Sequence, residues 1–222
     1  MIQNNSSNRD NGEDTKSKLS FPHSLNLKNS TEILEQLKAA KHGSHYLIVY
    51  PDIVTLREIY SSYIKTALDE RNEFVIVLPY YETVDTVRKI LSQGDGANID
   101  VRKYEKDGSL IIIDSLEGYF ETPPSKGKSL FSFVMQKIEY AKSSGKSGVS
   151  VFADLGSFFY PTSRIEDDVV EYELSLPTEF KGMNLKAFCI YHEDDFNQRF
   201  TEDEREKLLK HHGKDLITCP LS

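Results

Sequence analysis

The sequence predicts an α/β fold in which a mostly parallel central sheet lies between two layers of helices. Short apolar runs alternate with longer segments whose apolar residues recur every three or four positions. Several of the short runs are continuously apolar, which indicates strands that are buried on both faces, as in parallel sheets. We therefore expect a three-layer sandwich with right-handed crossovers between its parallel strands.

Length and composition agree with one folded domain. The chain has 222 residues, of which 38% are hydrophobic and 28% charged, and these values exclude a wholly disordered chain. Residues 1–24 are rich in Asn, Ser, Asp and Lys and have almost no large apolar side chains, so we expect them to form a disordered tail. Residues 25–222 are expected to form a single α/β domain.

The first half of the chain reads as a lead-in helix followed by two strand-then-helix units. Apolar residues recur at helical spacing over 33–40 and predict the lead-in helix. The runs at 45–50 (HYLIVY) and 73–79 (EFVIVLP) are predicted strands. Each is followed by an amphipathic helix, over 53–68 and 84–91 respectively.

The second half continues the alternation of strands and helices. In chain order we expect a strand at 99–103, a strand at 109–114 (SLIIID), a helix over 130–141, a strand at 149–154 (VSVFAD), a helix over 165–176, a strand at 185–191, a helix capped by Thr201 through Leu209, and an edge strand at 216–219.

Polar side chains gather where the predicted strands end. In open parallel sheets ligands bind beyond the carboxyl ends of the strands, which share one edge. The candidate binding residues at this edge are Tyr50, Asp52, Tyr80, Tyr81, Asp114 and Asp154. Carboxylates crowded together without a Lys or Arg favour a neutral or cationic small molecule over a phosphate, unless one acid is held protonated. In the alternative, each side chain is solvated alone and the tyrosines only cap the core.

Two predicted strands end in an acid, Asp114 and Asp154, as do strands that hold magnesium in P-loop NTPases. A phosphate loop requires G-x-x-x-x-G-K-[ST], and Thr122 occupies the first glycine position before Gly127-Lys128-Ser129. The bulky, acidic turn Tyr50-Pro51-Asp52 stands where a nucleotide-binding unit would have glycines. A divergent ATPase that uses Lys128 with Asp114 or Asp154 remains the alternative function.

Other catalytic and metal signatures are missing from the sequence. There is no G-x-S-x-G or G-x-G-x-x-G motif, and the six histidines have no metal-ligand spacing. His211 and His212 are expected to supply a favourable charge at a helix end. Cys189 lies in an apolar run and is expected to be a buried structural thiol. We expect no enzymatic activity, no metal and no cofactor.

Net charge and hydropathy limit the partners. The charge of −8 opposes a general nucleic-acid surface, and no apolar run approaches the ~18 residues of a membrane helix. With only two cysteines and a polar N-terminus, a cytoplasmic location is expected. The acidic segment 192–206 is expected to be a solvated face, or alternatively a docking patch for a basic partner or another subunit.

Several segments resemble the MEDS family, the methanogen and methylotroph DcmR sensory domain. The resemblance covers about 45–218 and rests on the segments HYLIVY at 45–50, DERNE at 69–73, FVIVL at 74–78, DGSLII at 107–112, EGY at 117–119, YE at 172–173 and FCIY at 188–191, with Phe196, Phe200 and His211. This family is thought to be related to KaiC-like RecA ATPases that lost the phosphate loop, and it occurs with transcription regulators and histidine kinases.

The resemblance implies a RecA-like architecture and sensing rather than turnover, and it supplies no catalytic residues. We expect a non-catalytic domain that binds a small ligand or a protein at the carboxyl edge of its sheet. Its output would pass through a regulatory partner protein, for example in transcriptional regulation, or through self-association.

Overall fold

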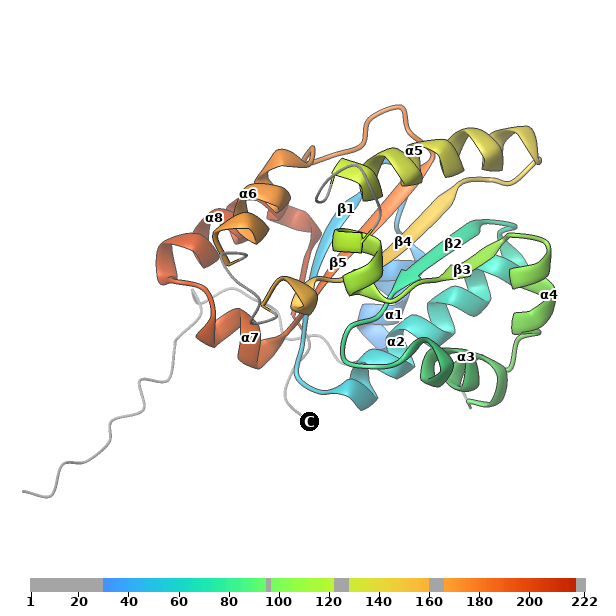
Figure 1. Ribbon diagram of the computed structural model, residues 1–222, viewed down its shortest axis with the longest axis horizontal. Helices are drawn as coiled ribbons and strands as arrows, with labels where there is room; N and C mark the ends of the chain where they lie inside the picture. The colour runs from blue at the N-terminus through green and yellow to red at the C-terminus, as the bar shows by residue number, and fades with distance from the viewer. Residues whose placement is uncertain (1–29, 95–96, 122–127, 160–165, 219–222) are drawn as a thin grey trace, which may run out of the picture.

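The computed structural model describes residues 30–94, 97–121, 128–159 and 166–218 (Figure 1). The expected tail at 1–24 lies outside these residues. Six strands form one sheet in the order β3-β2-β4-β5-β1-β6, and all neighbouring pairs are parallel. The strands are β1 (His45–Tyr50), β2 (Phe74–Leu78), β3 (Leu110–Ile112), β4 (Val149–Asp154), β5 (Leu185–His192) and β6 (Leu216–Thr218).

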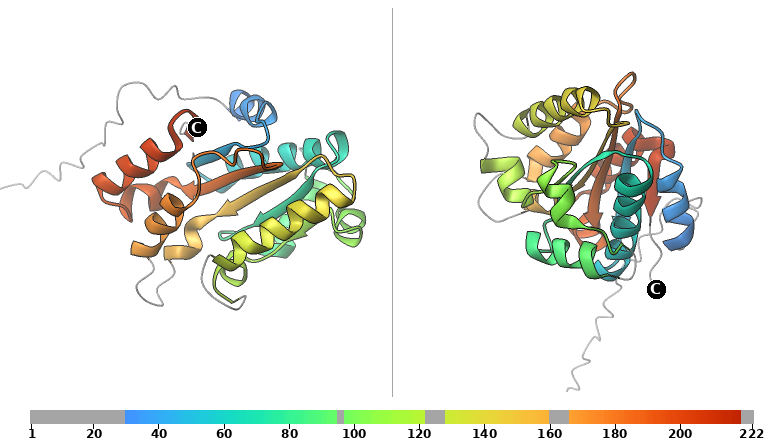
Figure 2. Two further views of the ribbon diagram at one scale, coloured as in Figure 1. Left: turned by 90° about the horizontal axis from the view of Figure 1, so that it is seen from above. Right: turned by 90° about the vertical axis from the view of Figure 1, so that its right-hand side faces the viewer.

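Helices cover both faces of the sheet, which confirms the predicted α/β class (Figure 2). They are α1 (Ser30–Lys38), α2 (Ile53–Lys65), α3 (Val84–Gln93), α4 (Val101–Lys106), α5 (Lys128–Ser143), α6 (Glu166–Ser175), α7 (Glu193–Gln198) and α8 (Glu202–His212). Short π-helical turns occupy Thr66–Glu70 and Glu117–Glu121, and 3-10 turns occupy Leu155–Phe159 and Gly213–Asp215.

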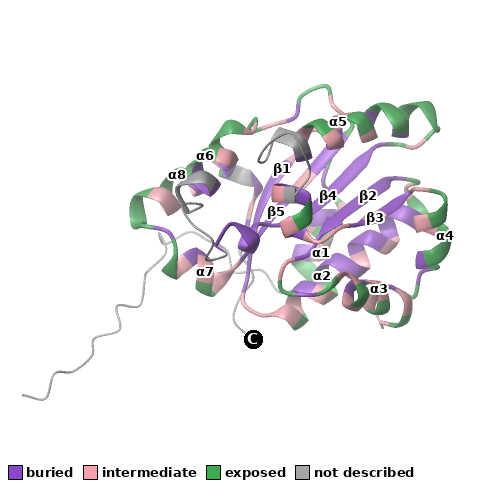
Figure 3. Ribbon diagram, viewed as in Figure 1, coloured by how far each residue is buried: buried purple, intermediate pink, exposed green. Residues whose placement is uncertain are grey.

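The alternation of side chains along each strand divides the core into two layers. In β1, Tyr46, Ile48 and Tyr50 pack with residues of α1 to α4, whereas Leu47 and Val49 pack with residues of α5 to α8. Every residue of β1, β2 and β4 is buried, as the continuous apolar runs predict (Figure 3). Burying each large aliphatic side chain stabilises the folded state by about 1.5–3 kcal/mol, so these buried strands contribute much of the stability of the fold.

One predicted strand is wrong. Residues 101–106 form helix α4, because the side chain of Asp100 accepts a hydrogen bond from the backbone N–H of Lys103 and caps a helix. Ile99 and Val101 are both buried, and apolar residues at alternate positions are typical of a strand. Here Ile99 precedes the helix and Val101 is its first residue. The strand expected at 109–114 is also shorter than predicted, since β3 ends at Ile112.

The last elements follow the prediction more closely. Thr201 and Glu204 form a reciprocal capping box at the start of α8. Strand β6 pairs with β1 at the edge of the sheet. The acidic segment after β5 contains an additional short helix, α7, whose Phe196 is fully buried, so this segment is not wholly a solvated face.

Candidate functional site

A small pocket opens at the carboxyl edge of the sheet. Its walls come from the ends of β2, β4 and β5, from α2 and α3, and from the loop that follows β2. The cavity itself measures about 20 Å³, room for about one water molecule, and the wider space of about 330 Å³ includes open solvent. The polar groups at the wall belong to Tyr60, Tyr80, Tyr81, Glu82 and Asp154, and the remaining lining is apolar. A mostly apolar cavity with a few fixed polar groups is typical of small-molecule sites.

Asp154 is the buried acid of this pocket, with only 4% of its surface exposed. Its Oδ1 accepts a hydrogen bond from the backbone N–H of Gly156 at 2.9 Å, and its Oδ2 accepts one from the Tyr50 hydroxyl at 3.2 Å. Burial raises the pKa of Asp154 to about 7, although these two hydrogen bonds oppose the change. The nearby charge of Glu82 raises this pKa further. Near neutral pH the carboxyl group is therefore divided between its acid and its carboxylate form.

Gly156 allows the tyrosines to approach Asp154. A Cβ atom at this position would lie 2.5 Å from Cδ1 of Tyr80 and 3.0 Å from Cε2 of Tyr81. The two tyrosine rings themselves meet edge to face with their centroids 4.9 Å apart. Only glycine leaves room for this arrangement, so the backbone after β4 shapes the wall of the pocket.

The structure brings together four of the six candidate residues. Tyr80, Tyr81 and Asp154 line the pocket, and Tyr50 reaches Asp154 through its hydroxyl without lining the cavity. Asp52 and Asp114 do not border it, because each carboxylate instead accepts hydrogen bonds from backbone N–H groups of its own turn. Of the six residues expected to converge, Tyr50, Asp52 and Asp114 therefore do not line this pocket.

Asp52 caps the helix that follows β1. Its Oδ1 accepts hydrogen bonds from the backbone N–H groups of Val54 and Thr55, both at 2.9 Å. These amides occupy the place where a phosphate loop would present donors, and Pro51 has no N–H. The alternative anchor, Lys128, begins α5, but its side chain and residues 122–127 lie outside the described part of the chain.

Glu82, Arg57 and Tyr60 belong to this site although none of them is among the six candidate residues. Glu82 is 8% exposed and accepts hydrogen bonds from Nε of Arg57 at 2.7 Å and from the Tyr60 hydroxyl at 3.1 Å. Arg57 therefore corrects the expectation of an edge without a basic side chain. A usable signal was present, because residues three apart on a helix share a face and Arg57 and Tyr60 have that spacing.

The mouth of the pocket connects to α7. Tyr81 is 45% exposed, and its hydroxyl donates a hydrogen bond to the carboxylate of Asp195. The ring of His192 lies against both Tyr81 and Tyr50, with centroid distances of 5.5 and 5.3 Å. Tyr81 thus joins the pocket wall to the acidic segment after β5.

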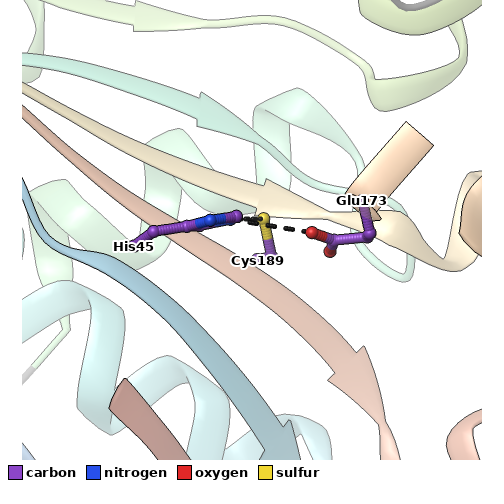
Figure 4. Close-up of side chains that lie close together, drawn as sticks. All are labelled: His45, Glu173 and Cys189. Carbon is purple, nitrogen blue, oxygen red and sulfur yellow. Dashed lines mark hydrogen bonds and ion pairs between the residues drawn. The ribbon is translucent and has the colours of Figure 1, made fainter. Parts of the chain in front are cut away.

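A second polar cluster lies in the other layer of the core, between the sheet and helices α6 and α8. It contains His45, Glu173, Cys189 and His212, and Figure 4 shows the first three. Cys189 is buried, as predicted. His212 was expected to supply a charge at a helix end, but it is buried and its ring lies next to the carboxylate of Glu173. The sequence offered no motif for this cluster, because its members are separated by many residues and come from four different elements.

Residues 44–212 match the family model for the methanogen/methylotroph, DcmR sensory domain, MEDS. No curated protein matches the chain. Among the described residues, no helix combines the length and the apolar character that crossing a membrane requires.

Proposed function

The chain belongs to the MEDS family of sensory domains, since the family model matches most of its length, and on this premise we propose that it senses a small molecule in the pocket at the carboxyl edge of its sheet. The proposed role is binding without catalysis. It rests chiefly on one observation, a buried carboxyl group, that of Asp154, in the wall of a mostly apolar pocket.

The chemistry of the wall favours a neutral or cationic ligand with an apolar body. In its acid form Asp154 can donate a hydrogen bond, and as a carboxylate it can pair with a cation. A phosphate or carboxylate ligand would meet both Asp154 and Glu82, although Arg57 partly balances Glu82. Ile53, Leu56 and Val87 supply apolar contact for the rest of the ligand.

The turn after β1 supports a domain that does not hydrolyse nucleotides. The amides at the start of α2 are engaged by Asp52, and Pro51 lacks an N–H. This turn agrees with the proposed kinship to RecA-like and KaiC-like ATPases that have lost their phosphate loop. A divergent ATPase using Lys128 remains the competing function.

Tyr81 suggests how binding would be transmitted. A ligand that contacts Tyr81 would compete with or strengthen its hydrogen bond to Asp195, and so would act on α7 and the acidic segment 192–206. We propose that this surface passes the signal to a regulatory protein partner, such as a transcription regulator, or to a second copy of the chain.

Native mass spectrometry of the purified protein tests the pocket, because it detects any small molecule that remains bound. For a molecule found in this way, calorimetry should show binding weakened about tenfold or more by Tyr80→Ala, which removes part of the wall, and by Asp154→Asn, which removes the carboxylate that can pair with a cation. Tyr140→Ala is the matched control, because Tyr140 is 48% exposed on α5 and does not line the pocket.

Two outcomes would overturn this function. If binding is unchanged in Tyr80→Ala and Asp154→Asn, the ligand binds elsewhere and the pocket is not the sensor site. If the protein hydrolyses ATP with magnesium and Lys128→Ala abolishes the turnover, the ATPase function replaces the sensory one.

A further inference from the structure

Four side chains that can bind a metal meet in the interior, away from the proposed ligand pocket. His45 begins β1, Cys189 lies in β5, Glu173 lies in α6 and His212 ends α8. His45 and Glu173 are fully buried, and only 3% of Cys189 and 4% of His212 are exposed. Figure 4 shows His45, Cys189 and Glu173 directed toward one another.

Short distances separate the atoms that could act as ligands. His45 Nε2 lies 3.3 Å from Cys189 Sγ and 3.4 Å from His212 Nε2. Glu173 Oε2 lies 3.6 Å from Nε2 of each histidine. The ligand atoms of His45, Glu173 and Cys189 are all within 4.8 Å of one another.

The hydrogen bonds outside the cluster orient both imidazole rings. Nδ1 of His45 lies 3.0 Å from the carbonyl oxygen of Pro177, and Nδ1 of His212 lies 2.9 Å from that of Leu208. A carbonyl oxygen can only accept, so each Nδ1 must bear the hydrogen. In the neutral ring, Nε2 then has a lone pair directed into the cluster.

Glu173 supplies a further buried acceptor. Its Oε1 accepts a hydrogen bond from the Tyr191 hydroxyl at 3.1 Å, whereas its buried Oε2 lies 3.6 Å from Nε2 of each histidine, beyond ordinary hydrogen-bond distance. A carboxylate oxygen and two imidazole nitrogens therefore face one another, with the Cys189 thiol beside them. Such a concentration of buried acceptors requires a cation or a proton between them.

We infer that His45, Glu173 and Cys189, with His212 as the fourth ligand, form a buried binding site for a divalent transition metal, with zinc as the preferred ion. Around tetrahedral zinc, bonds of about 2.0–2.3 Å place neighbouring ligand atoms about 3.3–3.6 Å apart. The four distances measured to the histidines, 3.3 to 3.6 Å, fall in this range. Imidazole, thiolate and carboxylate are ligands that zinc accepts together.

The surroundings match the outer shell of a metal site. Metal-bound histidines usually donate their other N–H to a carbonyl or carboxylate, and ligating carboxylates accept a further hydrogen bond. Pro177, Leu208 and Tyr191 fill these positions. Because the site is closed to solvent, the metal would be structural, and it would clamp α6 and α8 onto β1 and β5.

Metal analysis of the full-length protein is the direct test and needs no variant. Purified protein should contain about one equivalent of zinc, since the site is closed to solvent. After removal of zinc, added Co²⁺ should produce the visible bands of a tetrahedral site and a thiolate-to-cobalt band in the ultraviolet. If the protein contains no metal and Co²⁺ produces neither feature, a proton shared between His212 and Glu173 occupies the cluster and the proposal is wrong.

Variants assign the ligands. Cys189→Ser should abolish the thiolate-to-cobalt band, whereas Cys219→Ser, which alters the only other thiol, should retain it. His212→Gln should lose bound zinc, and the adjacent His211→Gln should keep it. Tyr191→Phe, which removes only an outer-shell hydrogen bond, should weaken zinc affinity about 10- to 100-fold. A cobalt spectrum unchanged by Cys189→Ser would exclude this cluster as the site, whatever the fate of the proposed ligand pocket.

Discussion

The hydroxyl of Tyr50, at the end of β1, donates a hydrogen bond to Oδ2 of Asp154, at the end of β4, although β5 lies between these two strands. Tyr50 is fully buried, and both burial and the adjacent carboxyl group raise its pKa, so it remains a neutral donor. The pair ties the two sides of the carboxyl edge together behind the pocket and holds Asp154 in its wall.

Asp154→Asn is expected to stabilise the protein above neutral pH. The pKa of Asp154 is about 7 in the folded protein, against an ordinary value of 3.8. Between these two pH values the folded state therefore keeps a proton that the unfolded chain has released. The resulting stability is fully present below the unfolded pKa and is lost as pH rises through the folded one. Asn resembles the protonated acid. The free energy of unfolding of the variant should therefore exceed that of the native protein by on the order of 2–4 kcal/mol at about pH 8.

Urea unfolding of both proteins at about pH 4, 6 and 8 measures this effect. The difference in the free energy of unfolding should shrink toward pH 4, where Asp154 is protonated in the folded state and the unfolded chain is close to its ordinary pKa of 3.8. A difference that does not change with pH would show that Asp154 does not titrate as proposed.

Tyr50→Phe should destabilise the protein, because it leaves Oδ2 of Asp154 without its donor. The expected cost is about 1–3 kcal/mol when the acid is ionised. Tyr46→Phe is a suitable control, since Tyr46 lies on the same face of β1 as Tyr50 but near the start of the strand. Equal losses in unfolding free energy for the two variants would argue against a special role of the Tyr50 hydroxyl.

Gly156→Ala should displace Tyr80, because the new Cβ would lie 2.5 Å from its ring. The expected loss of stability is about 1–3 kcal/mol, as in other overpacked sites. Tyr80→Ala removes the obstructing ring, so the double variant should lose less than the sum of the single losses. The free energies of unfolding of the single and double variants, from thermal or urea denaturation, test this. If the two losses simply add, the strain in Gly156→Ala does not come from contact with Tyr80.

Lys186→Met should be strongly destabilising. Nζ of Lys186 lies 2.5 Å from Oε1 of Glu73, and both side chains are only 2% exposed. Removal of the lysine leaves a buried carboxylate without its cation, at a cost of about 3–5 kcal/mol. Adding Glu73→Gln should restore part of the unfolding free energy, because the unpaired charge is then gone. No recovery in the double variant would contradict this account of the pair.

Asp52→Ala should cost about 1 kcal/mol, the usual effect of losing a helix cap. Asp52→Asn should retain most of the stability, because its amide oxygen can still accept from Val54 and Thr55. Unfolding curves of the two variants provide the comparison. If both lose the same amount, the charge of Asp52 rather than its capping hydrogen bonds stabilises α2.

The local patterns succeeded where burial and spacing decide the structure. Continuous apolar runs such as 149–154 predicted strands because only two-sided burial explains them, and Thr201 predicted the start of α8 through its capping chemistry. The same reasoning failed at 99–103, where two apolar residues at alternate positions suit both a strand and the capped start of α4. Asp100 was the deciding residue there.

The sequence by itself determined the parallel α/β class, the MEDS membership and the edge of the sheet at which polar side chains gather, because these depend on residue type and local spacing. Only the tertiary structure decided that Asp52 and Asp114 turn to their own backbone while Asp154 meets Tyr50. It alone also brought His45, Glu173, Cys189 and His212 together. Strand order and helix packing arise from contacts between distant segments, and no local pattern records which distant side chains will share one cavity.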